Sequence, residues 1–371
     1  MRVFILGAGF SSDAGYPLSR DLFRRLRENQ LEMEQKQKNP PQPWQDFESW
    51  WNDQSSWLPL FFPQFPVMEH VDLELLLTLM DLRLNEIERI TEKNYQQWLC
   101  NIRIGTITTP EESSDAVHHV WEVKDQNASL MGAGNALREA LTLLIERISM
   151  ETPVAGVDYI RDFSNRLEGG DVVITFNYDV ELEKTLIASL RWHFDDGYGL
   201  HIKIFRYRGT ADDPQTTVSL LKLHGSIGWR KGPDGRLKLE SPLASHLETS
   251  IQEGTDSSIA SPFEFVDSER IMIEPSYLKV FDNPDLAKIW AKAAEALSVC
   301  SEVTVIGYSF PQSDMAARAL IASSLSLREN VPVTVVDTSL QPKTILSNLL
   351  SREVTHLHFT TKQWLQSCKE E

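Results

Sequence analysis

The sequence predicts an α/β protein in which a parallel sheet is flanked by helices, with a mainly helical insertion. Short apolar runs that end in small or polar residues recur at five places in the chain, as in strands buried within a parallel sheet. Segments with helical apolar spacing lie between several of these runs. Strands that alternate with helices in this way favour a parallel α/β sheet.

Each predicted strand leads into a candidate site. The first strand covers residues 3–6, and a glycine turn from Gly7 to Gly15 follows it at once. Ligands of open α/β sheets bind at the carboxyl ends of the strands, so the residues that end each run are the ones to examine. We expect the later strands in "DVVITFNYD" (171–179), "SLLKLHGS" (219–226), "EVTVIGYSF" (302–310) and "VPVTVVDTS" (331–339).

The predicted helices indicate two parts of the chain. One helix opens near Ser19 or Asp21, and another covers "DLAKIWAKAAEALSVC" before the fourth strand. Helical apolar spacing also marks "VDLELLLTLMDLRLNEIERI" and "NALREALTLLIERI". We expect residues 1–25 and 151–371 to form one domain, and residues 26–150 to form a helical insertion that serves oligomer contacts or gating.

Two features of the insertion have structural interpretations. "MGAGN" (131–135) is like a second glycine turn but follows no strand, so we interpret it as a loop that leads into a helix. Residues 100–128 are polar and less regular. For the tryptophans of residues 44–57, which are Trp44, Trp50, Trp51 and Trp57, we expect core or loop packing, with an oligomer or partner surface as the alternative. Trp98 lies farther along the insertion.

Composition excludes several classes of function. The 371 residues carry a formal net charge of −17, which argues against bulk electrostatic binding to nucleic acid or to an anionic membrane. The three cysteines are far apart and form no C-x-x-C pair, so neither a disulfide framework nor a structural zinc site is supported. A reducing cytoplasm is the natural compartment. The apolar residues 3–6 are too few for a signal peptide or a membrane span.

The turn "GAGFSSDAGYP" has the properties of an anion site. Glycines let the backbone approach a pyrophosphate, and a helix N-terminus offers N–H groups and the positive end of a dipole. Such a site needs no large basic surface. The spacing of Gly7, Gly9 and Gly15 differs from the G-x-G-x-x-G of dehydrogenases, and a tight structural turn is the alternative.

The motif "TFNYD" places polar residues directly after a strand. Thr175, Asn177 and Asp179 stand at alternating positions. Asn and Asp at the end of a strand suit contacts to ribose hydroxyls or to a water molecule. The alternative is an Asx-type turn or a helix cap.

Two further motifs follow the same pattern. "KLHGS" places His224 after an apolar strand, and histidine titrates near neutrality and suits general base catalysis as well as structural roles. "GYSFPQSD" adds Gly307, Ser309 and Asp314, which either line the same cleft or form a turn.

Taken together and in this order, the motifs resemble the sirtuin-like NAD-binding family. The resemblance rests on "GAGFSSDAGYP", "TFNYD", "LHGS" and "VIGYS", with "VVD" near the end, and it covers residues 1–25 and about 168–340. It implies a Rossmann-like fold that binds NAD across the carboxyl edge of the sheet and attacks the nicotinamide–ribose bond.

The resemblance implies a role for each matching position. Asn177 and Asp179 match the pair beside the nicotinamide ribose, and His224 matches the catalytic histidine. A carboxylate at position 337 pairs with a ribose 2′-hydroxyl and repels a 2′-phosphate, which favours NAD over NADP. The residues expected to bind the rest of NAD are Gly7, Ala8, Gly9, Ser11, Pro17, Arg20, Thr175, Gly307, Ser309 and Asp337.

Departures from the family pattern narrow the expected activity. Leu18 stands where the protein deacetylases of the family have an acidic residue, and the two C-x-x-C pairs of their zinc ribbon are missing. The pattern is closer to the bacterial antiphage branch, whose members hydrolyse NAD. Within that branch the chain is similar to the sirtuin-like subunit that pairs with a HerA-type DNA-translocating ATPase.

We therefore expect a cytoplasmic, homo-oligomeric NADase without a metal, which depletes NAD in antiphage defence and is restrained by assembly or by a partner. One alternative is a non-catalytic subunit that senses NAD or ADP-ribose and scaffolds an assembly. The other is a protein deacylase or ADP-ribosyltransferase.

Overall fold

The computed structural model describes two compact units, which are treated separately below. The first comprises Met1–Leu18, Ile145–Glu274 and Lys279–Glu371, and the second comprises Ser19–Leu144 and Pro275–Leu278. Within them the described residues are 1–18, 21–36, 42–53, 58–61, 71–84, 110–151, 157–189, 191–193, 196–200, 217–232, 235–239, 270–272 and 283–369.

A six-stranded parallel sheet organises the first unit and confirms the predicted fold class. Its order is β3-β2-β1-β7-β8-β9. Numbered along the chain within this sheet, the order is 3-2-1-4-5-6, which is that of the Rossmann fold. The strands are β1 (Arg2–Leu6), β2 (Val172–Thr175), β3 (Ser219–Lys222), β7 (Glu302–Ile306), β8 (Val333–Val336) and β9 (Thr355–Leu357).

The sheet confirms the five predicted strands, and β9 is a sixth that they did not include. Thr355 is exposed and His356 and Leu357 are half-buried, so this edge strand lacks the continuous apolar run that marks the others. The strand ends are aligned, because Leu6 pairs with both Thr175 and Ile306. The residues that follow β1, β2 and β7 therefore leave the sheet at one edge.

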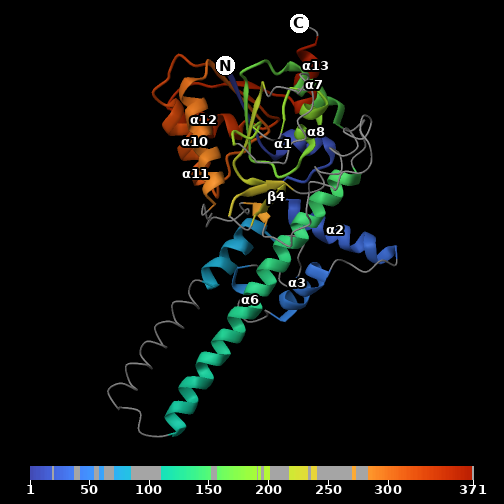
Figure 1. Cartoon of the computed structure of the whole chain (residues 1–371), viewed down its shortest axis with the longest axis vertical. Coiled ribbons are helices and arrows are strands. Elements are labelled where there is room, and N and C mark those ends of the chain that lie inside the picture. Colours follow the sequence, from blue (N-terminus) through green and yellow to red (C-terminus); the bar gives the residue numbers. More distant parts are fainter. Residues whose placement is uncertain are drawn as a thin grey trace. The chain divides into compact units, whose positions relative to one another are not determined.

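Helices cover this sheet in two packed groups. α7 packs against α8 and α13, while α11 packs against α10 and α12, and Figure 1 shows the two groups on opposite sides of the strands. The bounds are α1 (Ala8–Ser11), a short 3₁₀ turn η1 (Ser12–Ala14), α7 (Asp158–Arg166), α8 (Glu181–Ala188), α10 (Pro284–Val299), α11 (Met315–Leu325), α12 (Gln341–Leu350) and α13 (Thr361–Ser367).

A small antiparallel sheet begins directly after His224. Its order is β5-β4-β6, with β4 at Gly225–Lys231, β5 at Leu237–Leu239 and β6 at Arg270–Met272. Gly225 has φ +78°, and a Cβ there would lie 2.1 Å from the carbonyl oxygen of Ile271. The chain can therefore turn from β3 into β4 beside His224 only with glycine at this position.

The described residues of the second unit are mainly helical, in agreement with the predicted fold class. Its tryptophans confirm the core interpretation where they are described: Trp44, Trp50 and Trp51 are buried, and Trp57 and Trp98 lie outside the described residues. The ring of Phe23 packs against Trp44 and Trp51. The helices are α2 (Leu22–Gln35), α3 (Gln42–Asp53), α4 (Leu58–Phe61), a helix at 73–84, and α6 (Pro110–Glu151), whose residues from Ile145 on belong to the first unit.

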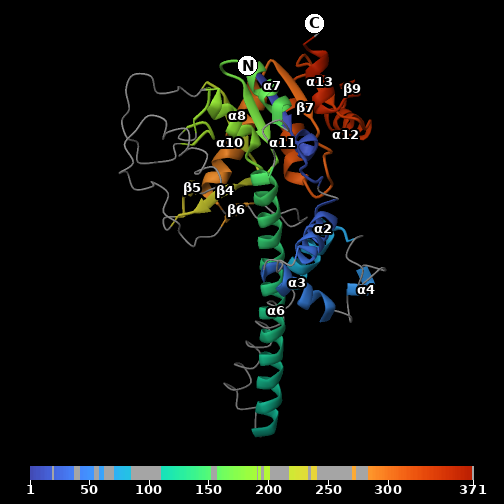
Figure 2. The same ribbon diagram turned by 90° about the vertical axis from the view of Figure 1, so that its right-hand side faces the viewer.

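The predicted loop at 131–135 is wrong, because these residues lie inside α6, as do residues 110–128 of the segment predicted to be irregular (Figure 2). Glycine in a helix interior costs only about 1 kcal/mol relative to alanine. Leu130, Ala133 and Leu137 are at most 5% exposed and lie on one face of the helix, and burial of that face outweighs the two glycines.

Candidate active site

The carboxyl edge of the sheet carries the predicted site residues that the structure describes, and it brings several of them together. Strand order reverses between β1 and β7, and open α/β sheets bind ligands at such a switch point. The turns that leave these two strands are in direct contact: Gly7 N donates to the carbonyl of Ile306 at 3.1 Å, and Gly9 N donates to the carbonyl of Gly307 at 2.9 Å.

Three predicted phosphate-binding glycines make that contact sterically feasible. Gly307 has φ +61°, and a Cβ on it would lie 2.5 Å from the backbone nitrogen of Phe10. A Cβ on Gly7 would lie 2.6 Å from the carbonyl oxygen of Gly307, and one on Gly9 would be 2.7 Å from the Cα of Gly307. These glycines thus allow two backbones to touch, and the amides of Gly7 and Gly9 are used within the protein.

A hydrogen-bonded chain joins the β1 turn to the end of β2. Asn177 Nδ2 donates to Ser11 Oγ at 3.0 Å, and Ser11 Oγ donates to Asp179 Oδ2 at 2.8 Å. Ser11 and Asp179 are buried, while Asn177 is partly exposed. Three predicted site residues from two segments far apart in the sequence therefore form one cluster, with Asn177 as its accessible end.

Asp179 is electrostatically unusual. Burial raises the pKa of its carboxyl group to about 6, and the neighbouring carboxylates of Glu181 and Glu183 push the pKa in the same direction. The charge of Lys222 and the hydrogen bond from Ser11 oppose this rise. A carboxyl group that titrates near neutrality at a candidate site suits a chemical role as well as a structural one.

A buried ionic cluster that the sequence motifs did not identify contacts Asp179. Lys222 Nζ lies 2.7 Å from Glu183 Oε1, and the Tyr198 hydroxyl donates to the same oxygen at 3.2 Å. Lys222 also donates to the carbonyl oxygen of Asp179. The available signal was Lys222 itself, a charged residue at the end of an apolar strand, because lysine is almost never fully buried without a partner.

Glu181 is the second centre of this cluster. Its Oε1 accepts hydrogen bonds from the Tyr16 hydroxyl at 2.7 Å, from Ser149 Oγ at 2.8 Å and from Lys184 Nζ at 2.9 Å. The pKa of Tyr16 is raised well above its usual range, first by burial and then by the charges of Asp179 and Glu181. The β1 turn, the end of α6 and the start of α8 are thereby tied together.

His224 lies between β3 and β4 in an aromatic environment. Its Nε2 is 3.0 Å from Asp314 Oδ1, and its ring contacts those of Phe176 and Tyr178, with centroids 5.0 Å and 6.2 Å apart. Phe176 and Tyr178 flank Asn177 in the chain, so the segments that carry Asn177 and His224 lie side by side. The turn that was one interpretation of this segment is present, because Asp314 N donates to the carbonyl of Pro311 at 3.1 Å, and the carboxylate of the same residue contacts His224.

Thr175 has a clear structural function. Its hydroxyl donates to the carbonyl of Leu6 at 3.3 Å and accepts from the backbone N–H of Asn177 at 3.1 Å. It therefore ties the ends of β1 and β2 together and fixes the backbone that presents Asn177.

The remaining predicted residues are dispersed along the same edge. Ser309 is exposed after β7, and Pro17 and Ala8 are partly exposed in the β1 turn. Asp337 follows β8, where its carboxylate accepts from Ser339 N at 2.7 Å, and burial raises its pKa. Arg20 lies outside the described residues.

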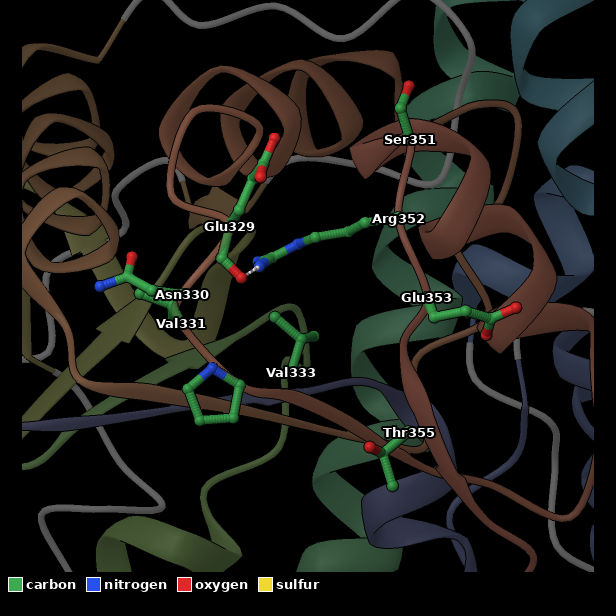
Figure 3. A pocket seen from close by; sticks show the side chains of 9 residues that line it. Glu329, Asn330, Val331, Val333, Ser351, Arg352, Glu353 and Thr355 are labelled. Atoms are coloured by element: carbon green, nitrogen blue, oxygen red, sulfur yellow. Dashed lines mark hydrogen bonds between the residues drawn. The ribbon is translucent and has the colours of Figure 1, made fainter.

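An open cavity of about 490 Å³ lies elsewhere, at the opposite edge of the sheet. It is lined by Val333 and Thr355, the first residues of β8 and β9. The Arg352 side chain extends toward Glu329, whose backbone oxygen accepts its hydrogen bond at 2.6 Å (Figure 3). None of the predicted site residues lines this cavity.

Comparisons with known proteins give distant structural likenesses. No protein-family model matches the chain, and no curated protein matches it. The chain is similar to the structure of Sir2Tm bound to a propionylated peptide, with 11% identity and a TM-score of 0.36 over 100% of this chain and 92% of the other. It is similar to a structure reported for the structural basis of sirtuin substrate affinity, with 13% identity and a TM-score of 0.35 over 100% and 93%.

Two features are absent from the described residues. None of the helices there combines the length and the apolar character needed to cross a bilayer. No group of three or more His, Cys, Asp or Glu side chains is placed there to hold a metal ion.

Proposed function

We propose that the protein hydrolyses NAD⁺ at the nicotinamide–ribose bond, with water as co-substrate and nicotinamide, ADP-ribose and a proton as products. The observation that carries the proposal is the chain Asn177–Ser11–Asp179 at the carboxyl edge of the sheet, beside the Rossmann switch point. The motifs that resemble the sirtuin-like family supply the same residues. Support from the sequence and support from the geometry thus fall on one site.

The chemistry of the bond sets what these side chains must do. Nicotinamide leaves NAD⁺ as a neutral molecule from a cationic state, so strong acid catalysis is unnecessary. The site has to stabilise an oxocarbenium-like ribose and admit a water molecule. Asn177 is the accessible end of the hydrogen-bonded chain and orients the ribose or the water. Asp179 stabilises the positive charge that develops on the ribose.

His224 acts as the general base. It accepts a proton from the attacking water, directly or through a ribose hydroxyl, while the ribose–nitrogen bond breaks and its electron pair leaves with nicotinamide. General base catalysis is typically worth about 10²–10⁴-fold. The phosphates and riboses of NAD⁺ bind along the β1 turn, with Gly7, Ala8 and Gly9, and at the exposed Ser309. Asp337 faces the adenosine ribose.

Product analysis tests this proposal. Purified protein is incubated with NAD⁺, and nicotinamide and ADP-ribose are the expected products; acetylated ADP-ribose, modified protein or unchanged NAD⁺ would each contradict it. Asn177→Ala and His224→Ala should lose at least about 99% of turnover while remaining folded. Asn348→Ala makes the same chemical change at an exposed position on α12 and should retain wild-type turnover.

Regulation forms a further part of the proposal. Unrestrained NAD⁺ hydrolysis would be lethal, so we propose that a homo-oligomer or a partner such as a HerA-type ATPase controls the site, through the insertion predicted at residues 26–150, during antiphage defence in the cytoplasm. NAD⁺ consumption by the chain alone is compared with consumption by the chain with partner and DNA. Equal rates would eliminate the regulatory part and leave the hydrolase part intact.

A further inference from the structure

The carboxylate of Asp314 joins two side chains that follow separate strands, β3 and β7. Its Oδ1 lies 3.0 Å from His224 Nε2, and its Oδ2 accepts from the Tyr308 hydroxyl at 2.8 Å. All three residues are at most 5% exposed. Tyr308 also stacks on Phe176, with ring centroids 4.3 Å apart, and Phe176 contacts the His224 ring. Both the carboxylate and the imidazole are therefore held from more than one side.

The position of Asp314 in the chain makes this arrangement informative. Asp314 stands at the N-cap of α11, where an aspartate normally accepts from the helix's own N–H groups. Its side chain makes no capping hydrogen bond, whereas Asn283 caps α10 and Thr360 caps α13 in the usual way. The carboxylate is thus directed to His224 and Tyr308 instead of stabilising its own helix.

The backbone that leads to Asp314 is constrained as well. Phe310 has φ +52°, a conformation that bulky residues rarely adopt. Its ring is buried and lies 4.7 Å from that of Tyr308. The segment from Tyr308 to Asp314 therefore holds its shape against a local preference, as segments that position functional groups often do.

We infer that Asp314 is a positioning residue for His224, with Tyr308 fixing the orientation of its carboxylate. The inference rests on the proposed function for its chemical consequence. When His224 accepts the proton from water, the imidazolium gains a counter-ion at Nε2 that is already in place. Asp314 itself touches no substrate and takes up no proton in this step.

Kinetics of variants separate a positioning role from a merely structural one. Asp314→Asn keeps the shape of the side chain and removes its charge, and it should lower kcat by roughly 10- to 1,000-fold, with the KM for NAD⁺ changed by less than about twofold. Asp158→Asn makes the same change at an exposed residue of α7 and should leave kcat unaltered. The double variant His224→Ala/Asp314→Asn should be no slower than His224→Ala alone, because residues that act as a unit are not additive.

A second measurement does not depend on turnover. Proton titration of the His224 ring, followed by ¹⁵N NMR and assigned with His224→Gln, should shift to lower pH by about one unit or more in Asp314→Asn, because an opposite charge at this distance favours the imidazolium. NMR is needed because Asp179, with a pKa of about 6, also contributes to the acid limb of any rate profile. Tyr308→Phe is the second variant, expected to give a smaller change of kcat, and it serves if Asp314→Asn does not fold.

The outcomes distinguish the two proposals. If the wild-type protein cleaves NAD⁺ while Asp314→Asn and Tyr308→Phe retain its kcat and its His224 titration, the positioning role is overturned and the proposed function stands. Losses of kcat that add fully in the double variant would also overturn it. If the His224 titration shifts as expected but wild-type protein leaves NAD⁺ intact, the pairing is real and the proposed function fails.

Discussion

Lys222 and Glu183 form an ion pair in the interior of the protein, with Nζ and Oε1 2.7 Å apart and each side chain 1% exposed. Lys222 is the last residue of β3, and Glu183 lies in the first turn of α8. Ions of opposite charge at this depth are tolerated only when each has its partner and further hydrogen bonds. The carbonyl of Asp179 and the hydroxyl of Tyr198 supply those bonds.

Removing one member of this pair should destabilise the fold strongly. Lys222→Met leaves Glu183 charged without its counter-ion and should lower the free energy of unfolding by about 3–5 kcal/mol. Lys222→Met combined with Glu183→Gln, which keeps an acceptor for Tyr198, should cost clearly less than the two single changes added together. Urea unfolding of the four proteins gives the coupling energy, and strictly additive costs would show that the two charges do not interact.

Asp179 should make stability depend on pH. Its folded-state pKa of about 6 lies above the ordinary value of 3.8, so the folded protein holds this proton more tightly than the unfolded chain. The stabilisation is complete below about pH 4 and is lost as pH rises through about 6. The free energy of unfolding of Asp179→Asn, relative to that of the wild type, should therefore be about 2.4 kcal/mol higher at pH 7 than at pH 4.

Urea unfolding at the two pH values measures this difference. Asp158→Asn, at an exposed position, serves as the matched control. A wild-type to Asp179→Asn difference that is the same at both pH values would contradict the raised pKa.

Gly307 should tolerate alanine much less well than Gly170, another glycine with a positive φ angle. Gly307→Ala adds a Cβ 2.5 Å from the Gly9 and Phe10 backbones, whereas Gly170 has φ +91° with nothing within 4 Å of such an atom. Both changes put alanine into a left-handed backbone conformation, which costs about 1–2 kcal/mol. Gly307→Ala should cost about 1–3 kcal/mol more, because its Cβ overpacks against the neighbouring backbone. Thermal and urea unfolding compare the two; equal costs would mean that the β1 and β7 turns separate easily.

Thr175 should matter for activity through the position of Asn177. Thr175→Val removes the hydroxyl that bonds to Leu6 and Asn177 and should lower stability by about 1–2 kcal/mol together with NAD⁺ turnover. Thr175→Ser keeps the hydroxyl and should retain both. If Thr175→Val instead weakens NAD⁺ binding with no loss of stability or kcat, the hydroxyl contacts the substrate directly, as the sequence motif suggested.

Local patterns predicted the strands of the main sheet better than the other elements. Continuous apolar runs mark β1, β2, β3, β7 and β8 because both faces of a central parallel strand are buried. The edge strand β9 and the three-residue β5 and β6 carry no such run. The glycines in α6 led to the wrong prediction of a loop at residues 131–135. Helix propensity is a weak local contribution, and the burial of a helix face outweighs it.

The sequence by itself determined which residues are candidates for a chemical role and that they follow strands, because apolar runs and the polar residues that end them are local properties of the chain. Only the tertiary structure decided which of them meet. Ser11 and Asp179 are 168 positions apart, and His224 and Asp314 are 90 apart. Such contacts depend on strand order and register, which arise from packing the whole sheet. For the same reason it was folding that paired Lys222 with Glu183 and directed the Asp314 carboxylate to His224 instead of to the N–H groups of its own helix.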